Sequence, residues 1–188
     1  MTEKEKMERG LLYDANYDEA LLAEQLAAKD LCHAFNQLKP CDETAQYELL
    51  RQLLGGIGKR CIIRAPFFCD YGSRITVGEN FYCNHNCVIL DGGGVSFGDN
   101  VFIAPNCGFY TAGHPENIEK RNAGLEYARP ICIGSNVWIG AQTAVLPGIT
   151  IGDGSIIGAA SVVTHDIPSG VVAAGNPCRV LRPVDPSR

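Results

Sequence analysis

The sequence predicts a mostly β protein, in which short strands stack into a parallel β-helix behind an N-terminal helical segment. Apolar residues recur at every sixth position from Ile133 to Val163, and a glycine follows most of them. This period suits one short strand and one turn per repeat, and stacking the repeats buries a continuous apolar column. Glycine at most second positions argues against helices. A β-sandwich, the alternative, would not keep a strict period of six over this length.

Residues 1–57 are predicted to be helical, and residues 58–188 to form the β-helix with its C-terminal tail. Asn16 precedes an acidic stretch as a candidate helix cap, and Pro40 ends that helix. Asp42 is a candidate cap for a second helix. We expect each helix to bury an apolar stripe against the rest of the protein. The stripes consist of Leu22, Leu26, Cys32, Phe35 and Leu38, followed by Leu49, Leu50, Leu53 and Leu54.

The hexads extend upstream with one change of phase. Repeats that begin at Phe97 keep the phase of Ile133, whereas repeats that begin at Val77 are two residues out of register. We expect the glycine-rich residues 91–94 to absorb this slip. The first and fifth residues of each hexad are expected to point inward, and glycine, asparagine or aspartate to form the turns.

Residues 115–130 interrupt the repeat. If the hexads continued through them, Pro115, Arg121 and Tyr127 would point into the core, where none of these residues belongs. We therefore expect this stretch to leave the coil as an extruded loop. A loop of about 16 residues inside a compact domain is usually functional or disordered. His114 stands directly before the interruption.

Composition and charge exclude several classes of function. The chain has 188 residues, of which 46% are hydrophobic, and a net charge of −5 without a basic stripe, so we expect no nucleic-acid binding. No apolar run is long enough to cross a membrane, and the charged N-terminus does not resemble a signal peptide. The nine cysteines form no disulfide-like framework, which favours reduced thiols and a cytoplasmic protein.

Longer motifs narrow the comparison to one family. The hexads, together with FYTAGHP, RPICIGSNVWIGAQTAVLPG, IIGAASVVTHDIP and AAGNPCRVLRP, resemble the maltose and galactoside O-acetyltransferases of the hexapeptide-repeat acyltransferases. The resemblance covers nearly the whole chain and implies a left-handed coil. It also implies transfer of acetyl from acetyl-CoA to a hydroxyl of maltose, glucose or a galactoside, in a homotrimer with sites between subunits and without a metal. The hexads alone would also fit serine or antibiotic acetyltransferases.

Acetyl transfer requires a base for the hydroxyl proton and donors for the oxyanion. A histidine titrates near neutral pH, and His114 lies at the break in the coil. The resemblance implies that His114 is the general base and that Asn84 stabilises the oxyanion or positions the acceptor. The alternatives are a structural loop histidine and an ordinary turn asparagine.

The resemblance also suggests residues that bind the two substrates. Asp70 matches an acceptor-pocket position, and Asp91 and Asn16 are further candidates for binding the sugar, although solvated turn acids would fit as well. Coenzyme A carries phosphates, which arginine can hold bidentately. The predicted residues for binding acetyl-CoA are Ala141, Ala159, Thr164, His165, Arg179, Arg182 and Trp138. At His165 relatives often have lysine, and Trp138, with Val101, is an apolar outward position that could instead pack between subunits.

Four rival interpretations are weighed. Cys83, His85 and Cys87 invite a metal site, but the hexad rule places both cysteines in the core, where free cysteines are common. A zinc lyase of the carbonic-anhydrase type needs three histidines, and only His85 and His114 lie near the coil. A non-catalytic scaffold would not need the charged loop. A non-sugar acceptor is also compatible with the sequence.

Overall fold

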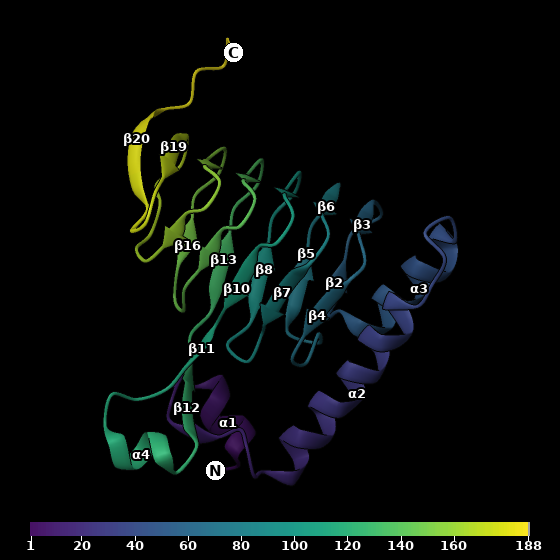
Figure 1. Ribbon diagram of the computed structural model, residues 1–188, viewed down its shortest axis with the longest axis vertical. Helices are drawn as coiled ribbons and strands as arrows, with labels where there is room; N and C mark the ends of the chain where they lie inside the picture. Colours follow the sequence, from purple (N-terminus) through teal and green to yellow (C-terminus); the bar gives the residue numbers. More distant parts are fainter. Residues whose placement is uncertain (188) are drawn as a thin grey trace.

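The computed structural model describes residues 1–187, and it confirms a mostly β protein built on a parallel β-helix (Figure 1). Three parallel sheets form the faces of the coil. The first face contains β2 (Gly56–Ile57), β5 (Ile75–Val77), β8 (Val95–Phe97), β13 (Ile131–Ile133) and β16 (Thr150–Ile151). The second contains β3 (Cys61–Ile63), β6 (Phe81–Cys83), β9 (Phe102–Ile103), β14 (Trp138–Ile139), β17 (Ile156–Ile157), β19 (Val171–Ala174) and the antiparallel β20 (Arg179–Pro183). The third contains β4 (Phe67–Cys69), β7 (Cys87–Leu90), β10 (Gly108–Tyr110), β15 (Ala144–Val145) and β18 (Val162–Val163).

The first and fifth hexad residues point into the coil, as predicted. Three of the fifth residues are polar, and each buried hydroxyl donates a hydrogen bond to a backbone carbonyl: Thr143 to Gly140, Ser155 to Pro168 and Ser161 to Gly158. The prediction for Val101 was wrong, because this fifth-position residue is fully buried and Phe102 points outward instead. The buried first and fifth residues are Ile133, Val137, Ile139, Thr143, Val145, Ile149, Ile151, Ser155, Ile157, Ser161, Val163 and Ile167.

Different positions of the hexad have different roles in the turns. The fourth residue adopts a left-handed conformation, which asparagine tolerates better than most residues. Asn100 and Asn136, for example, have φ of 56° and 59°. Glycine at the second position serves close packing between coils instead. A Cβ at Gly98 would lie 2.8 Å from the backbone carbon of Gly134 in the next coil.

The change of phase reflects two sizes of coil. Successive strands are 20 residues apart at Thr76 and Ser96, but 18 residues apart at Cys132 and Thr150. The additional residues lie in wide turns between the third and first faces, after β4 and β7. The extruded segment leaves the coil at the same corner, after β10. Residues 91–94 therefore absorb the slip, as predicted. The wide turns and the extruded segment all lie at this corner of the coil.

Two N-terminal helices, α2 (Glu19–Asn36) and α3 (Glu43–Leu53), cover the end of the coil (Figure 1). The short helix α1 (Glu3–Glu8) packs beside the extruded segment instead. Asp42 caps α3 as predicted, but Asp18 rather than Asn16 caps α2. The predicted stripe of α2 was partly wrong, because Leu22 and Leu26 are exposed. The buried residues of α2 are Leu21, Ala28, Cys32 and Phe35.

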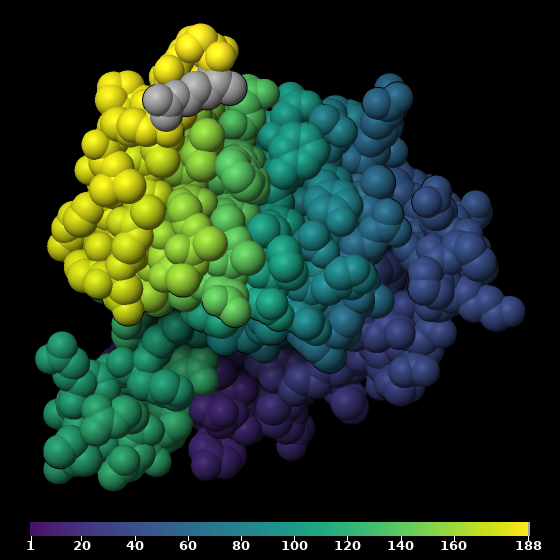
Figure 2. Space-filling view, turned by 45° about the horizontal axis from the view of Figure 1, so that its top comes forward, coloured from purple at the N-terminus to yellow at the C-terminus, as the bar shows by residue number. Residues whose placement is uncertain are grey.

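The extruded segment is an ordered hairpin rather than an irregular loop. It contains β11 (Ala112–Gly113), α4 (Ile118–Asn122) and β12 (Leu125–Ala128), and it forms a lobe beside the N-terminal residues (Figure 2). The short strand β1 (Tyr13–Asp14) pairs with β12. A small apolar cluster joins α1, β1, α2 and the hairpin, so the N-terminus holds this lobe against the coil. The cluster consists of Met7, Tyr13, Ala15, Leu21, Tyr71 and Ala128.

Candidate active site

A pocket of about 360 Å³ lies at the wide corner, between the N-terminal segment, the coil and the hairpin. It brings together three of the predicted site residues, Asn16, Asp70 and His114. Gln25 and Glu126 also line it, and neither was predicted from the sequence. Residues more than a hundred positions apart therefore meet in one cavity.

The imidazole of His114 is held in a defined orientation. Its Nδ1 lies 3.1 Å from the carbonyl oxygen of Leu125. A carbonyl can only accept a hydrogen bond, so Nδ1 carries the proton and neutral Nε2 keeps its lone pair. About half of the side-chain surface is exposed (49%). The geometry gives His114 one fixed nitrogen and one nitrogen that is free to accept a proton.

Glu126 lies directly behind this free nitrogen. Its Oε1 is 3.8 Å from Nε2 of His114, and its Oε2 accepts a hydrogen bond of 3.3 Å from the buried hydroxyl of Tyr13. A carboxylate at this distance stabilises an imidazolium once Nε2 has gained a proton. The sequence signal was weak, because Glu126 is one of several charges in the interruption. The antiparallel pairing of β11 with β12 brings Glu126 to His114, and the pairing of β12 with β1 brings it to Tyr13.

Asp70 is the most perturbed acid that faces the pocket. Burial, followed by the negative charges of Asp91 and Glu126, raises the pKa of its carboxyl group to about 6. Lys29 acts in the opposite direction. Folding therefore opposes ionisation of this group. A carboxyl group kept in a destabilising environment that faces a cavity is typical of a functional position.

Asp70→Asn is expected to stabilise the protein near neutral pH. The folded-state pKa of Asp70 lies above the unfolded value, so its ionisation weakens folding as the pH rises from about 4 to about 6. Removing the charge should increase the free energy of unfolding by about 1–2 kcal/mol at pH 7.5 and by much less at pH 4. Paired thermal or urea denaturation at both pH values measures this difference. An equal effect at both pH values would show that charge is not the cause.

The predicted role of Asp91 in binding the sugar is not supported by its position. Its side chain has no exposed surface, and both oxygens accept hydrogen bonds from backbone N–H groups, at 2.8–3.3 Å. The donors are Asp70, Tyr71 and Arg74. Asp91 holds the wide turn in shape, and its charge acts on the carboxyl group of Asp70, which lines the pocket.

Asn84 lies at a different edge of the coil. It begins the turn between the second and third faces, whereas the hairpin with His114 leaves between the third and first faces. The third-face strand between these edges, Cys87–Leu90, spans about 10 Å. The predicted base and oxyanion residues are therefore separated within one chain.

Comparisons with known proteins identify the family. A family model described as the maltose acetyltransferase hexapeptide capping motif matches residues 6–58, and the bacterial transferase hexapeptide model matches residues 133–165. Galactoside O-acetyltransferase of Escherichia coli is 42% identical over 181 residues, which cover 96% of this chain and 89% of that protein. The chain belongs to the maltose and galactoside O-acetyltransferase family. It is an acetyltransferase by this membership.

Solved structures of acetyltransferases have the same fold along their whole length. A maltose O-acetyltransferase from Clostridium difficile 630 superposes with a TM-score of 0.96 at 49% identity, covering 98% of both chains. A galactoside acetyltransferase in complex with coenzyme A superposes with a TM-score of 0.95 at 42% identity, covering 98% of this chain and 92% of that one.

The residues predicted to bind acetyl-CoA lie on two edges of this acetyltransferase. Ala141 and Ala159 stack at the same edge as Asn84, where Ala160 N–H donates to Ala141 at 2.8 Å. The residues at this edge are small, which leaves the backbone open to an extended ligand. Thr164 and His165 follow β18 at the edge that carries His114. Their side chains lie 2.8 Å apart (Oγ1 to Nδ1).

The remaining predicted contacts are exposed. Trp138 projects from the second face, with 54% of its surface exposed. Arg179 and Arg182 lie on β20, at the end of the same sheet, and both are exposed. The guanidinium groups can therefore meet a phosphate in solution.

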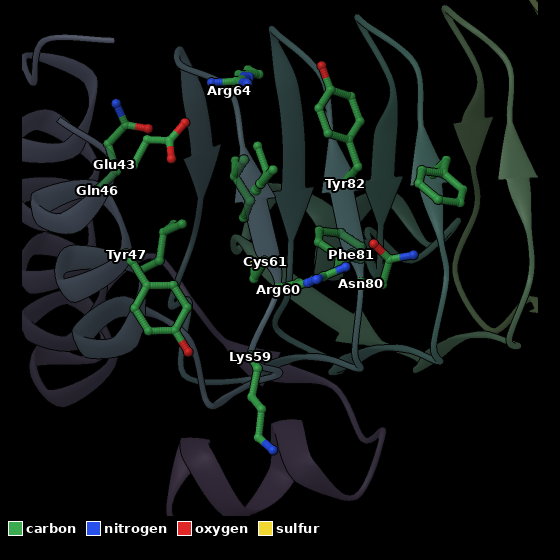
Figure 3. Close-up of a pocket in the computed structure, with 14 residues that line it drawn as sticks. Glu43, Gln46, Tyr47, Lys59, Arg60, Cys61, Arg64, Asn80, Phe81 and Tyr82 are labelled. Carbon is green, nitrogen blue, oxygen red and sulfur yellow. The ribbon is translucent and has the colours of Figure 1, made fainter. Parts of the chain in front are cut away.

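Another groove is separate from this site. It has a volume of about 530 Å³ and lies on the second face, between Tyr47 of α3 and Tyr82 of β6 (Figure 3). Cys83 and Cys87 point into the coil, and within residues 1–187 no cluster of three potential metal ligands occurs. In the same described part of the chain, none of the helices has the length and apolar character of a membrane span.

Proposed function

We propose that this protein transfers the acetyl group of acetyl-CoA to a hydroxyl of maltose, glucose or a galactoside, with His114 as general base. The observation that carries this proposal is the fixed imidazole, whose unprotonated Nε2 faces a pocket with Asp70 and Asn16. Carboxylate and amide groups are suitable partners for sugar hydroxyls. No covalent enzyme intermediate is required, because the acceptor hydroxyl attacks directly.

In the proposed reaction, Nε2 of His114 takes the proton of the acceptor hydroxyl. The hydroxyl oxygen bonds to the thioester carbonyl carbon, and the bond from carbon to the coenzyme A sulfur breaks. His114 then returns the proton to the departing thiolate. Glu126 stabilises the imidazolium between the two transfers, and the carbonyl of Leu125 prevents the ring from turning.

The Glu126→Gln substitution tests this assistance. It keeps the size of the side chain but removes the charge next to the imidazolium, so kcat should fall about 10- to 100-fold, with little change in the KM of acetyl-CoA. Glu119→Gln, on exposed α4 of the same hairpin, is the matched control and should retain full activity. Equal kcat values for both variants would contradict the assigned role of Glu126.

The separation of Asn84 from His114 supports a homotrimer with shared sites. In a three-fold arrangement, the hairpin edge of one subunit can meet the Asn84 edge of the next. The third face lies between these two edges, so it then turns towards the three-fold axis. The outward residues of that face are suited to contact, being Phe68, Val88, Gly108, Ala144 and Val162. Those of the first face are small or polar, being Thr76, Ser96, Cys132 and Thr150.

The neighbour's hairpin would then lie over the second face. This face carries an apolar ladder, which a monomer would leave in water: Ile62, Tyr82, Phe102, Trp138 and Ile156. Ile62, Phe102 and Trp138 each have more than 40% of their surface exposed. Exposed apolar patches of this kind mark protein interfaces. The same arrangement joins the two edges that carry the acetyl-CoA residues into one groove.

We expect Arg179→Ala with Arg182→Ala to raise the KM for acetyl-CoA about tenfold or more, with little change in the KM of the sugar. The phosphates take no part in bond making. Loss of the arginines that hold them should therefore weaken binding of the ground state and of the transition state equally. Steady-state kinetics with each substrate varied separately measures this split. A rise in the sugar KM instead would place the cofactor phosphates elsewhere.

Release of free thiol from acetyl-CoA, measured with a panel of sugars, tests the proposed function directly. Turnover with maltose, glucose or a galactoside is the expected result. Turnover only with a non-sugar hydroxyl would retain the acetyltransferase chemistry and reject the acceptor class. The nine unpaired cysteines of the described chain support action in the reducing cytoplasm.

A further inference from the structure

Two thiols meet where the helical segment packs on the coil. Cys32 of α2 and Cys69 of β4 place their Sγ atoms 3.6 Å apart, although the residues are 37 positions apart in sequence. Both side chains are buried, with 3% and 6% of their surfaces exposed. A disulfide bond is about 2.05 Å long, so a movement of roughly 1.5 Å would join the sulfurs. Neither thiol has a part in the proposed acetyl transfer.

A groove of about 490 Å³ leads to this thiol pair. Lys29 and His33 of α2 line it together with both cysteines, and Phe68 of β4, which belongs to the face proposed to contact neighbouring subunits, closes its other side. The groove therefore connects the buried sulfurs with the surface of the subunit on the side of α2, where Lys29 and His33 are exposed. A small oxidant can reach the pair without unfolding of the protein.

The two sulfurs differ in reactivity. They share a hydrogen bond, which lowers the pKa of Cys32, whereas the same hydrogen bond and burial raise the pKa of Cys69. The thiolate is the reactive form of cysteine. Cys32 is thus the sulfur that reacts with an oxidant first, and Cys69 is the resolving sulfur.

Flanking hydrogen bonds fix the register of helix and strand at this point. The side chain of Asn36 donates to the carbonyl of Phe67 at 3.0 Å, and Phe67 N–H donates back to the Asn36 oxygen at 2.9 Å. Asn36 lies one helical turn after Cys32, and Phe67 lies on the same strand as Cys69. Side-chain rotation, rather than movement of the backbone elements, therefore brings the sulfurs together.

We infer that Cys32 and Cys69 are a redox-active pair, which peroxide converts into a disulfide that cross-links α2 to β4. Peroxide oxidises the Cys32 sulfur to a sulfenic acid and releases one water. The Cys69 sulfur then attacks the sulfenic sulfur, forms the S–S bond and releases a second water. In total, the two thiols lose two electrons and two protons, and hydrogen peroxide is reduced to two water molecules.

The parent protein for the test carries Cys41→Ser and Cys132→Ser, which remove the two exposed thiols. The folded protein is treated with hydrogen peroxide, alkylated, digested and mapped by mass spectrometry. We expect one cross-linked peptide pair, Cys32 with Cys69, that dithiothreitol reverses. Because the bond constrains a long segment of the unfolded chain, Tm should rise by about 5–10 °C.

Cys32→Ala and Cys69→Ala should each abolish the cross-link and the rise in Tm, whereas Cys83→Ala, which removes a thiol inside the coil, should retain both. The inference is overturned if the cross-link forms only after unfolding in urea. It is also overturned if Cys32 proceeds to a sulfinic acid without pairing. The peptide map of the parent protein decides between these outcomes even if an alanine variant fails to fold.

Discussion

His114→Ala is expected to lower kcat by about 10²- to 10⁴-fold, the usual contribution of a general base. The variant loses an imidazole in the pocket whose Nδ1 is held by a backbone carbonyl and whose Nε2 can accept a proton. The KM for acetyl-CoA should change little, because the imidazole meets the acceptor hydroxyl rather than the phosphates.

The control is His33→Ala, which removes an exposed histidine of α2 outside the acceptor pocket. This variant should retain the activity. Thermal denaturation and light scattering of His114→Ala establish that its fold and assembly are intact. Near-normal turnover by folded His114→Ala would reject the base assignment. It would also remove the main chemical reason for the hairpin.

The regular part of the fold could be predicted from the sequence because one rule repeats. Each hexad residue has a fixed task, so Ile133 and Val163 indicate the same inward direction although they lie on different faces. Departures from the rule were also informative. The slip near residues 91–94 and the break after His114 both occur at the corner where the pocket forms. In this regular solenoid, the positions where the sequence period is interrupted therefore indicate the edge that carries the candidate site.

Residues outside the period could not be predicted in the same way. Glu126 approaches His114 because β12 pairs with β11 inside the interruption, and it meets Tyr13 because β12 also pairs with the distant β1; neither pairing leaves a periodic signal in the sequence. Asp91 was assigned to sugar binding because it lies beside glycines. Its carboxylate instead accepts hydrogen bonds from the backbone N–H groups of the wide turn. The handedness of the coil depended on the family resemblance, since spacing alone is the same for both hands.

Mixed trimers provide the most direct test of the shared site, because His114 and Asn84 are proposed to come from different subunits. His114→Ala and Asn84→Ala should each be nearly inactive alone, the latter by about 10²- to 10³-fold as an oxyanion contact is lost. After denaturation and joint refolding at equal amounts, about three quarters of random trimers contain both chains, and each of these has one site of three with both residues intact. The mixture should therefore recover about one quarter of wild-type activity.

A matched control for this experiment mixes two variants whose substituted residues lie in the same pocket of one chain. His114 and Glu126 lie 3.8 Å apart in one chain, so mixing His114→Ala with Glu126→Gln cannot create a site that contains both native residues. That mixture should show no more activity than its Glu126→Gln chains supply. If the first mixture also fails to recover, although native mass measurement shows mixed trimers, then Asn84 acts within its own chain or not at all. If activity rises about two orders of magnitude above that of either variant in the first mixture alone, the site must contain residues from two subunits.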